Sequence, residues 1–339
     1  MTTKNRSGMV AIMVTAMIMV ILSLITLGFA RLVSREQRQA LDDQLSTQAF
    51  YAAESGVNAA AAKMRGGVLA EKNDCDVSTY NNGTIDSATP EVRFTCLMID
   101  PTPTELKFNN GFIKTDRARV VPVFTNPLAT ELNFRWSDNN PARVNAGADC
   151  DVRRIPALNQ WGDDRVAMLE VDLIPFPNAA TGNLNREFLD QNTATFLFYP
   201  CGDSSASVTT VNYTNFRAGD ASGSRRGNIQ AVFCDKSGGY TCSVTVNGFP
   251  AMNYYARIKS IYSSANVEVA GKSGTNVVSF ANAQVVVDST GRANDVLRRV
   301  QVRLPFESQA LKPEASLQSK DEICKLYTVT GTTVENGCN

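Results

Sequence analysis

The fold of this chain is decided by residues 4–57, which read KNRSG (4–8), MVAIMVTAMIMVILSLITLGFA (9–30), RLVSREQRQALDDQLST (31–47) and QAFYAAESGV (48–57). The 22 residues from 9 to 30 carry no charge. As a helix they would be about 33 Å long, which is enough to cross the hydrocarbon core of a bilayer. We therefore expect a helix that spans a membrane and contacts membrane lipid.

A secretory signal peptide has a similar start, but its apolar region is only about 7–15 residues long and ends at a small-residue cleavage site. Here the apolar run is longer, and the charged sequence RLVSREQR follows it. Small and apolar residues then recur at spacings of three and four, which places them on one face of a helix. These residues are Leu41, Leu45, Ala49, Ala52, Ala53, Gly56, Val57 and Ala60. The pattern predicts one helix over residues 9–65, with residues 9–30 in lipid and the rest against a folded domain.

A short basic leader that ends in glycine, followed by the apolar half of a long helix, resembles a type IV pilin or pseudopilin precursor. Residues 48–57 are similar to the QAFYAAESG signature of PilX-like minor pilins. This resemblance implies a leader at residues 1–8, cleavage by a prepilin peptidase after Gly8, and a methylated mature N-terminus at Met9. It also implies that other pilin subunits and the inner-membrane assembly machinery are partners.

The fifth mature position departs from the pattern of most major pilins, because it is Met13 rather than glutamate. In the family this carboxylate is thought to neutralise the terminal amine of a neighbouring subunit, and a buried charge without a partner is costly. The resemblance therefore implies a minor subunit. Two explanations stay open: a tip or initiating position, and a group of subunits that tolerates an apolar residue there.

The small residues Ala49, Ala52, Ala53 and Gly56 predict a close approach between the helix backbone and a sheet or another helix. In the pilin family both contacts occur, since the lower helix packs in a central bundle and the upper part lies under its own head. Glu54 is the only acid among these small residues. We expect it to cap or bond a strand backbone rather than to act in catalysis.

The positive charges on the two sides of the apolar run nearly balance, so the positive-inside rule does not decide the orientation. The cysteines do, because an even number of them, all beyond residue 70, fits a disulfide framework in an oxidising compartment. We therefore expect a single-pass membrane protein with its head outside the cell. Eight cysteines allow 105 pairings, and we expect neighbours to pair. The expected pairs are Cys75 with Cys96, Cys150 with Cys201, Cys234 with Cys242, and Cys324 with Cys338.

The residue types present argue against metal sites and most catalytic sites. Zinc sites usually have cysteine pairs at C-x2-4-C spacing or histidine ligands, whereas this chain has no histidine and no pair closer than Cys234 and Cys242. Without histidine there is no Ser-His-Asp or Cys-His system, and we expect neither a cofactor nor an enzyme. Calcium binding near Asp138 or Asp163 and Asp164 is a weaker hypothesis than a solvated turn, because EF-hand spacing is missing. Gly271-Lys272-Ser273 lacks the earlier glycine of a phosphate loop, so we interpret it as a turn between strands.

After Gly66-Gly67, which predicts the end of the helix, the hydrophobic period changes from 3.6 to 2 and indicates strands. Three segments alternate clearly: 92–96, 167–173 and 299–304. Further strands are expected over residues 118–124, 131–136, 194–199, 229–233, 254–262, 267–269 and 277–280. Residues 283–291 and 296–304 predict two strands around a turn with Gly291 and Asn294-Asp295. They resemble the closing hairpin of pilin heads, in which a strand, a Ser-Thr-Gly-like turn and an Arg-Arg-Val strand follow one another. The predicted fold is α+β: a long helix packed on an antiparallel sheet, with a large β-rich insertion.

The predicted organisation has five parts. These are the leader (1–8), the long helix (9–65), an elaborated β-rich head (66–250), a closing β-meander (251–306) and a C-terminal tail with a disulfide (307–339). Lysine and arginine number 33, as do aspartate and glutamate, so no overall charge attracts nucleic acid. DNA binding through basic pairs such as Arg298-Arg299 is a minor hypothesis, and the ligand of the head stays open.

Two functions fit these features. The first is a minor pilin-like subunit that is inserted in the membrane, processed and extracted into a filament. The second is an adhesin or uptake receptor that stays anchored in the membrane and never joins a filament. An enzyme ranks third, since the sequence contains no catalytic constellation.

Overall fold

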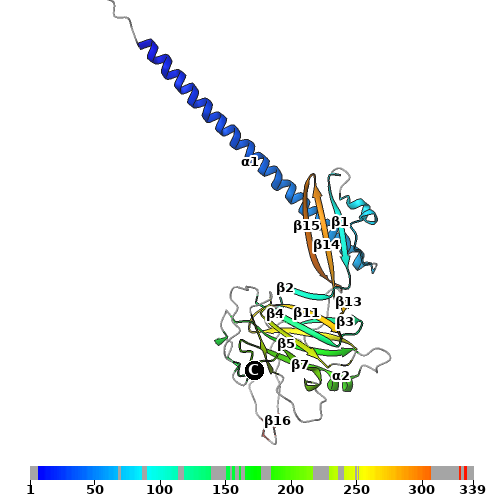
Figure 1. Cartoon of the computed structure of the whole chain (residues 1–339). Coiled ribbons are helices and arrows are strands. Elements are labelled where there is room, and N and C mark those ends of the chain that lie inside the picture. The colour runs from blue at the N-terminus through cyan, green and yellow to red at the C-terminus, as the bar shows by residue number, and fades with distance from the viewer. Residues whose placement is uncertain are drawn as a thin grey trace, which may run out of the picture. The chain divides into compact units, whose positions relative to one another are not determined.

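The computed structural model describes residues 7–67, 70–85, 90–113, 118–138, 150–152, 155–156, 160–161, 165–176, 185–216, 229–235, 240–248, 250, 252–306, 328–329 and 332–333. The chain divides into two compact units. The first contains residues 1–101 and 285–304, and the second contains residues 102–284 and 305–339. Figure 1 labels several helices and strands of both units.

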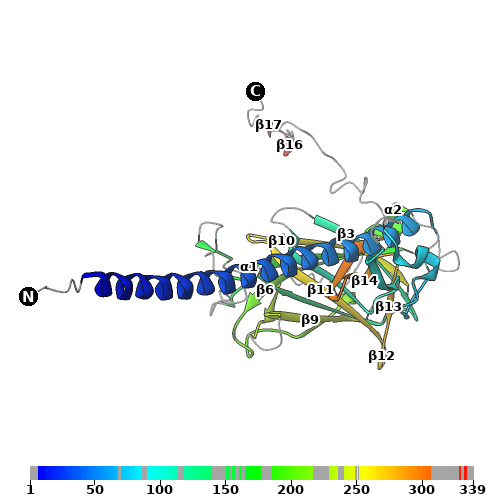
Figure 2. The ribbon, with the colours of Figure 1, turned by 90° about the horizontal axis from the view of Figure 1, so that it is seen from above.

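The first unit is built on one long helix, α1, which runs from Ser7 to Arg65. Figure 2 shows it as a continuous coil, and its 59 residues correspond to about 88 Å at about 1.5 Å per residue. The predicted helix end is confirmed. The N–H of Gly66 donates to the carbonyl of Ala62 at 3.2 Å, and Gly67 has a φ of +73°, which glycine adopts without a steric penalty.

A three-stranded sheet completes the first unit. Its order is β1-β14-β15, with β1 at Val92–Asp100, β14 at Gln284–Ala293 and β15 at Val296–Pro305. β1 and β14 are antiparallel, and a two-residue turn at Asn294-Asp295 joins β14 to β15. A 3-10 helix, η1 (Ser78–Gly83), comes between α1 and β1 along the chain. The predicted fold class, a long helix with an antiparallel sheet, is confirmed.

The second unit contains a β-sandwich of two sheets, and β16 and β17 form a separate two-stranded sheet. One sheet of the sandwich has the order β13-β3-β10-β5-β6-β8, and the other has the order β12-β11-β4-β9-β7, with β2 also paired to β11. Pairing is antiparallel except between β6 and β8 and between β7 and β9. The elements are β2 (Glu105–Ile113), β3 (Ala118–Asn126), β4 (Glu131–Ser137), β5 (Met168–Phe176), α2 (Arg186–Asn192), β6 (Ala194–Cys201), β7 (Thr210–Asn212), η4 (Tyr213–Phe216), β8 (Ile229–Phe233), β9 (Cys242–Asn247), β10 (Asn253–Ile261), β11 (Ala265–Ser273), β12 (Asn276–Val277), β13 (Ser279–Ala281), β16 (Thr328–Val329) and β17 (Thr332–Thr333).

The two sheets of the sandwich share one apolar core. Side chains of β4 and β11 meet those of β5, β6 and β10 in a single buried cluster. Trp136 of β4 is fully buried and stacks on Phe198 of β6, with ring centroids 6.1 Å apart. Its indole N–H donates to the carbonyl of Ala167 at 2.9 Å, so the only polar atom of this side chain is satisfied. Trp136 therefore ties one sheet to the other.

Most of the predicted strands are present, with ends within a few residues of those expected, but several elements were not predicted, among them β2, β9 and α2. β2 contains Asn-Asn-Gly at residues 109–111, a combination typical of turns, and only its pairing with β11 makes it a strand. β9 is short, and α2 has only seven residues. Helix α2 begins at a cap that the sequence contains, since the N–H of Phe188 donates to the side chain of Asn185 at 2.8 Å.

Residues 251–306, which we expected to form one closing meander, are divided between three sheets. β10 and β13 lie in one sheet of the sandwich and β11 and β12 in the other, whereas β14 and β15 pack with α1. Alternation of apolar and polar residues shows that a strand has a buried face. It does not show which neighbour covers that face, because long-range pairing decides this.

Two predicted turns are strands in the structure. Gly271-Lys272-Ser273 are the last residues of β11, and the turn follows at Gly274-Thr275. Ser289-Thr290-Gly291 lie inside β14, whereas the predicted turn at Asn294-Asp295 is present. Glycine and serine favour turns in isolation, but at both places a neighbouring strand or helix requires a small residue.

We expect Trp136→Ala to lower the free energy of unfolding of the second unit by about 3–5 kcal/mol, because it leaves a cavity between the two sheets. Denaturation of the detergent-solubilised chain, followed by circular dichroism, measures this loss. Val277→Ala is the control, since Val277 is 59% exposed and its loss should stay within about 0.5 kcal/mol. Equal losses for the two variants would contradict a shared core at Trp136.

Candidate functional site

Helix α1 has two parts that differ in what surrounds their side chains. All side chains from residue 12 to 44 are exposed in the chain itself. Beyond residue 45 the helix buries one face, and this face lies in the first unit against the sheet of β1 and β14. One element therefore provides both an unburied segment and a packed segment.

The unburied segment is strongly apolar. Its best 18-residue window has a mean hydropathy of 2.5, and none of that window is buried, so by length and composition the helix can cross a membrane. Large apolar side chains in this segment, such as Ile12, Met17 and Phe29, are 63–71% exposed. Exposing so much apolar surface to water is unfavourable. Lipid or the helices of other proteins must therefore cover it.

The packed segment presents the small residues that the sequence predicted for close packing. Ala49, Ala52 and Ala53 are fully buried, and Gly56 is buried with them. Val57 and Ala60 extend the same face toward the end of the helix, with 7% and 1% exposure. We call these six residues the helix seam.

The closest approach between the helix seam and the sheet is at Gly291 of β14. A Cβ atom at Gly291 would overlap the carbonyl oxygen of Ala49 and the amide nitrogen of Ala53. The backbone φ of Gly291 is not in the left-handed region, so glycine is needed here for space and not for conformation. The sequence pattern did not indicate that Gly291 is a spacer, because Ser-Thr-Gly is typical of a turn.

A second close contact lies about one turn further along α1, at Gly56. A Cβ atom at Gly56 would collide with the hydroxyl of Ser289 and would come within 3.2 Å of the Phe94 ring. Ser289 is fully buried, and among the described residues its hydroxyl has no hydrogen-bond partner. The seam therefore needs a glycine on the helix and small residues on β14.

Polar contacts hold both sides of the packed helix. On one side the Arg298 guanidinium donates to the Ser46 hydroxyl at 2.8 Å. On the other side the Lys63 ammonium lies 3.9 Å from the centre of the Tyr80 ring and 3.4 Å from the carbonyl of Thr79. Burial raises the pKa of Tyr80 above its ordinary value. These contacts limit rotation of α1 on the sheet.

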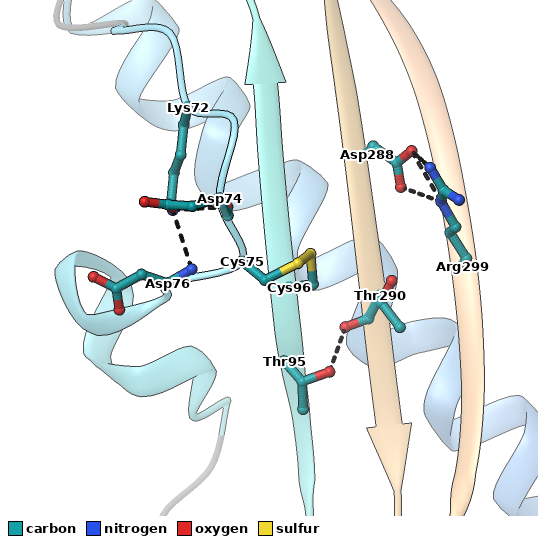
Figure 3. Close-up of a disulfide and its surroundings, with 9 residues drawn as sticks. All are labelled: Lys72, Asp74, Cys75, Asp76, Thr95, Cys96, Asp288, Thr290 and Arg299. Atoms are coloured by element: carbon teal, nitrogen blue, oxygen red, sulfur yellow. Dashed lines mark hydrogen bonds and ion pairs between the residues drawn. A yellow bond between two sulfur atoms is a disulfide. The ribbon is translucent and has the colours of Figure 1, made fainter.

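The segment that follows α1 is joined to β1 by the Cys75–Cys96 disulfide, shown in Figure 3. Next to it, Lys72 forms an ion pair with Asp74. Hydrogen bonds lower the pKa of both acids in this segment: Asp74 accepts one from Lys72, and Asp76 accepts from the backbone and hydroxyl of Ser78. Both acids are exposed, so the covalent disulfide constrains this segment more than their hydrogen bonds do.

The outer face of the same sheet carries an ion pair between Asp288 of β14 and Arg299 of β15 (Figure 3). The Arg299 Nε donates to both carboxylate oxygens, at 2.8 and 2.9 Å. The side-chain hydrogen bond with Asp288 raises the pKa of Arg299. The arginines of the Arg298-Arg299 pair thus have partners on opposite faces of β15. These contacts account for the two basic residues without a contact to DNA.

Other residues of the QAFYAAESG motif point away from the sheet. Phe50 is 47% exposed and Tyr51 is 62% exposed. Glu54 is exposed as well, which corrects the expectation that it lies in the seam and bonds a strand. Glu54 lies two residues before Gly56, which corresponds to a rotation of about 200° around the helix axis. Its side chain therefore lies on the side of α1 opposite Gly56. Gly8 and Met9 lie in the first turn of α1.

Two further disulfides lie in the second unit, Cys150–Cys201 and Cys234–Cys242. With Cys75–Cys96 they are three of the four pairs expected from the sequence. Cys324 and Cys338 lie outside the described residues. Asp163 and Asp164, the calcium candidates beside Trp161, also lie outside them. Within the described ranges no cluster of three cysteine, aspartate or glutamate side chains could hold a metal ion.

The charged clusters of the sandwich are cross-strand pairs. Glu268 of β11, with only 3% of its side chain exposed, lies between Lys107 of β2 and Arg135 of β4, and each cation pairs with one of its oxygens. Arg257 of β10 bonds Glu170 and Asp172 of β5 at 2.7 and 2.6 Å. In both clusters every acid contacts a cation, and in the second one Arg257 is shared by two acids. This is the arrangement of structural ion pairs.

A comparison with protein families supports the interpretation of α1. Residues 7–58 match the family model described as PilX N-terminal, so the chain has a PilX-like, type IV pilin-related N-terminal region. The match includes the span and most of the seam, and it ends before the head. The comparisons with curated proteins and with solved structures gave no significant match.

We expect Gly291→Ala to lower the free energy of unfolding of the first unit by about 1–3 kcal/mol, because the new Cβ forces α1 away from β14. In an open strand the same change would be favourable. Thr290→Ala, on the opposite face of β14, is the matched control. Thermal unfolding measures the effect, together with the rate at which a protease cleaves the chain just beyond residue 65. Unchanged stability of Gly291→Ala would contradict the close contact.

Proposed function

We propose that this protein is a minor pilin-like subunit of a type IV pilus or a related filament, with a structural and not an enzymatic role. The observation that carries the proposal is the construction of α1. The helix that matches the PilX N-terminal model has an uncovered apolar half and another half packed under its own sheet. A subunit that moves from a membrane into a filament needs both halves.

In this proposal the apolar half of α1 is covered first by lipid and later by other subunits. Before assembly, lipid covers side chains such as Met17, Ile21 and Leu24, which are 51–71% exposed in the chain alone. After extraction, the helices of neighbouring subunits cover them, since the apolar surface cannot stay in water. The inner-membrane assembly machinery would drive this transfer, and membrane lipid and other pilin subunits would be successive partners.

Processing of the N-terminus is part of the proposal. A prepilin peptidase would cut after Gly8, and Met9 would become the methylated N-terminus. Met13 then occupies the position where major pilins place a glutamate. An apolar residue there avoids a buried, unpaired carboxylate but cannot neutralise a neighbour's amine. This supports a minor subunit, at the tip or elsewhere.

The disulfides support an orientation with the head outside the cell. Cys75–Cys96, Cys150–Cys201 and Cys234–Cys242 all lie beyond the span, and disulfides persist in oxidising compartments. The head would then be displayed at the cell surface, on the pilus, where it could bind a surface or a DNA ligand. A statically anchored adhesin or uptake receptor shares this orientation, so processing has to distinguish the two functions.

Mass spectrometry of the mature N-terminus tests processing. We expect the chain purified from its cells to begin at a methylated Met9, without residues 1–8. Gly8→Leu should leave the leader attached, because the peptidase would meet a bulky side chain at the cut, whereas Ser7→Ala should still be cut. An intact leader on the native chain would contradict the filament subunit and favour the static anchor.

Incorporation into a filament can be tested through the seam. We expect Ala53→Phe to be missing from sheared filaments, since Ala53 is fully buried against the sheet and a ring cannot fit there. Ala62→Phe is the matched control, because Ala62 is exposed on the same helix. Immunoblots of filament and membrane fractions separate failed incorporation from loss of the protein. Equal incorporation of both variants would contradict the role of the seam.

A further inference from the structure

The two edges of the sheet in the first unit are not alike. Along β1, Lys72 and Ile99 exchange two backbone hydrogen bonds of 2.8 Å. Thr84 bridges to Arg93 at the other end of the strand, and the Cys75–Cys96 disulfide joins the same segment to β1 (Figure 3). The edge at β1 is therefore occupied by the chain's own backbone.

The opposite edge is β15. In the sheet order of the described residues, β14 is its only neighbour. The turn at Asn294-Asp295 and the bond from the N–H of Phe306 to the carbonyl of Ala283, 3.2 Å long, give the register. Alternate residues of an edge strand point their backbone groups away from the neighbour. In β15 these include Leu297, Arg299 and Gln301.

The end of β15 supports this register. Pro305 belongs to the same alternate set and has no N–H. Proline is tolerated in a sheet where its nitrogen faces away from the neighbouring strand. Up to Pro305, β15 has ten residues without an internal break. The outward backbone groups therefore form a long, regular edge.

The two faces of β15 differ in chemistry. On the helix side, where Arg298 reaches Ser46, Val300 and Val302 are only half-buried. On the outer side Arg299 keeps 63% of its side chain exposed although it pairs with Asp288. The strand contains three arginines, with Arg303 the third, and no acid. An added strand would thus meet the half-buried valines beside Arg298 on one face, and Arg299 and Arg303 on the other.

We propose that the edge of β15 accepts an extended strand from another protein, with acidic side chains alternating with apolar ones. Backbone bonds to an open edge give affinity, and alternate side chains give specificity. The acidic residues would lie beside Arg299, and the apolar residues would cover Val300 and Val302. A second copy of β15 is a poor match, because it would bring three more arginines and no acid to this edge, and like charges repel.

This inference does not depend on incorporation into a filament, since a static anchor would present the same edge. The test uses the detergent-solubilised full chain and a fluorescent ten-residue peptide of alternating Glu and Val. We expect it to bind at least about tenfold more tightly than a Lys-Val peptide at low salt, with the difference shrinking as salt is added. Equal binding of the two peptides would overturn the acidic partner.

Hydrogen exchange locates the contact. Bound Glu-Val peptide should slow exchange of the amides of Leu297, Arg299 and Gln301, and should leave β1 unchanged. Gln301→Pro should abolish binding without unfolding the sheet, because the lost N–H points away from β14. Gln301→Thr keeps the N–H and should bind normally. Protection elsewhere, no binding of the Glu-Val peptide, or full binding by Gln301→Pro would overturn the proposal.

Discussion

The first unit depends on one close contact between backbones, where α1 crosses β14 at Gly291. No side chain stands between the carbonyl of Ala49, the amide of Ala53 and the strand. Dispersion contacts of this kind are individually weak and become significant only when many atoms touch. The helix seam therefore has to be small over several turns, and each larger residue would separate many pairs of atoms at once.

The close contact also explains how one helix serves two surroundings. The seam needs alanine and glycine, which are poor at covering apolar surface, whereas the span needs large apolar residues to suit lipid. The chain separates these demands along α1, because the side chains of residues 12–33 are exposed whereas one face of residues 49–60 is buried. We infer that the head holds the helix firmly without burying the surface that lipid or other subunits must reach.

The sandwich is stable for different reasons. Its two sheets share a core of aromatic and aliphatic side chains, and two disulfides close loops within it. Its charges are used locally, as at Glu268 between Lys107 and Arg135. With 33 basic and 33 acidic residues overall, little charge is left for steering a distant partner. Recognition by this protein should therefore depend on specific surfaces and edges.

The sequence by itself determined the helix, its span and its small face, because these follow from periods and lengths that neighbours along the chain create. Ala49, Ala52, Ala53 and Gly56 were identified in this way, as were most strands and the hairpin of β14 and β15. Glu54 was misplaced because it lies near the seam in sequence but on the other side of the helix. The three disulfides match the pairing of neighbours, which short loops favour.

Only the tertiary structure decided which strands are neighbours. The strands of residues 251–306 look alike in sequence, yet β14 and β15 pack with α1 while β10 and β11 lie in different sheets. Only the fold shows that Gly291 is a spacer and not a turn. It also shows that, among the described residues, β1 is paired on both edges whereas β15 has β14 as its only neighbour. These features depend on contacts between residues far apart in the chain, and a local pattern carries no information about the distant partner.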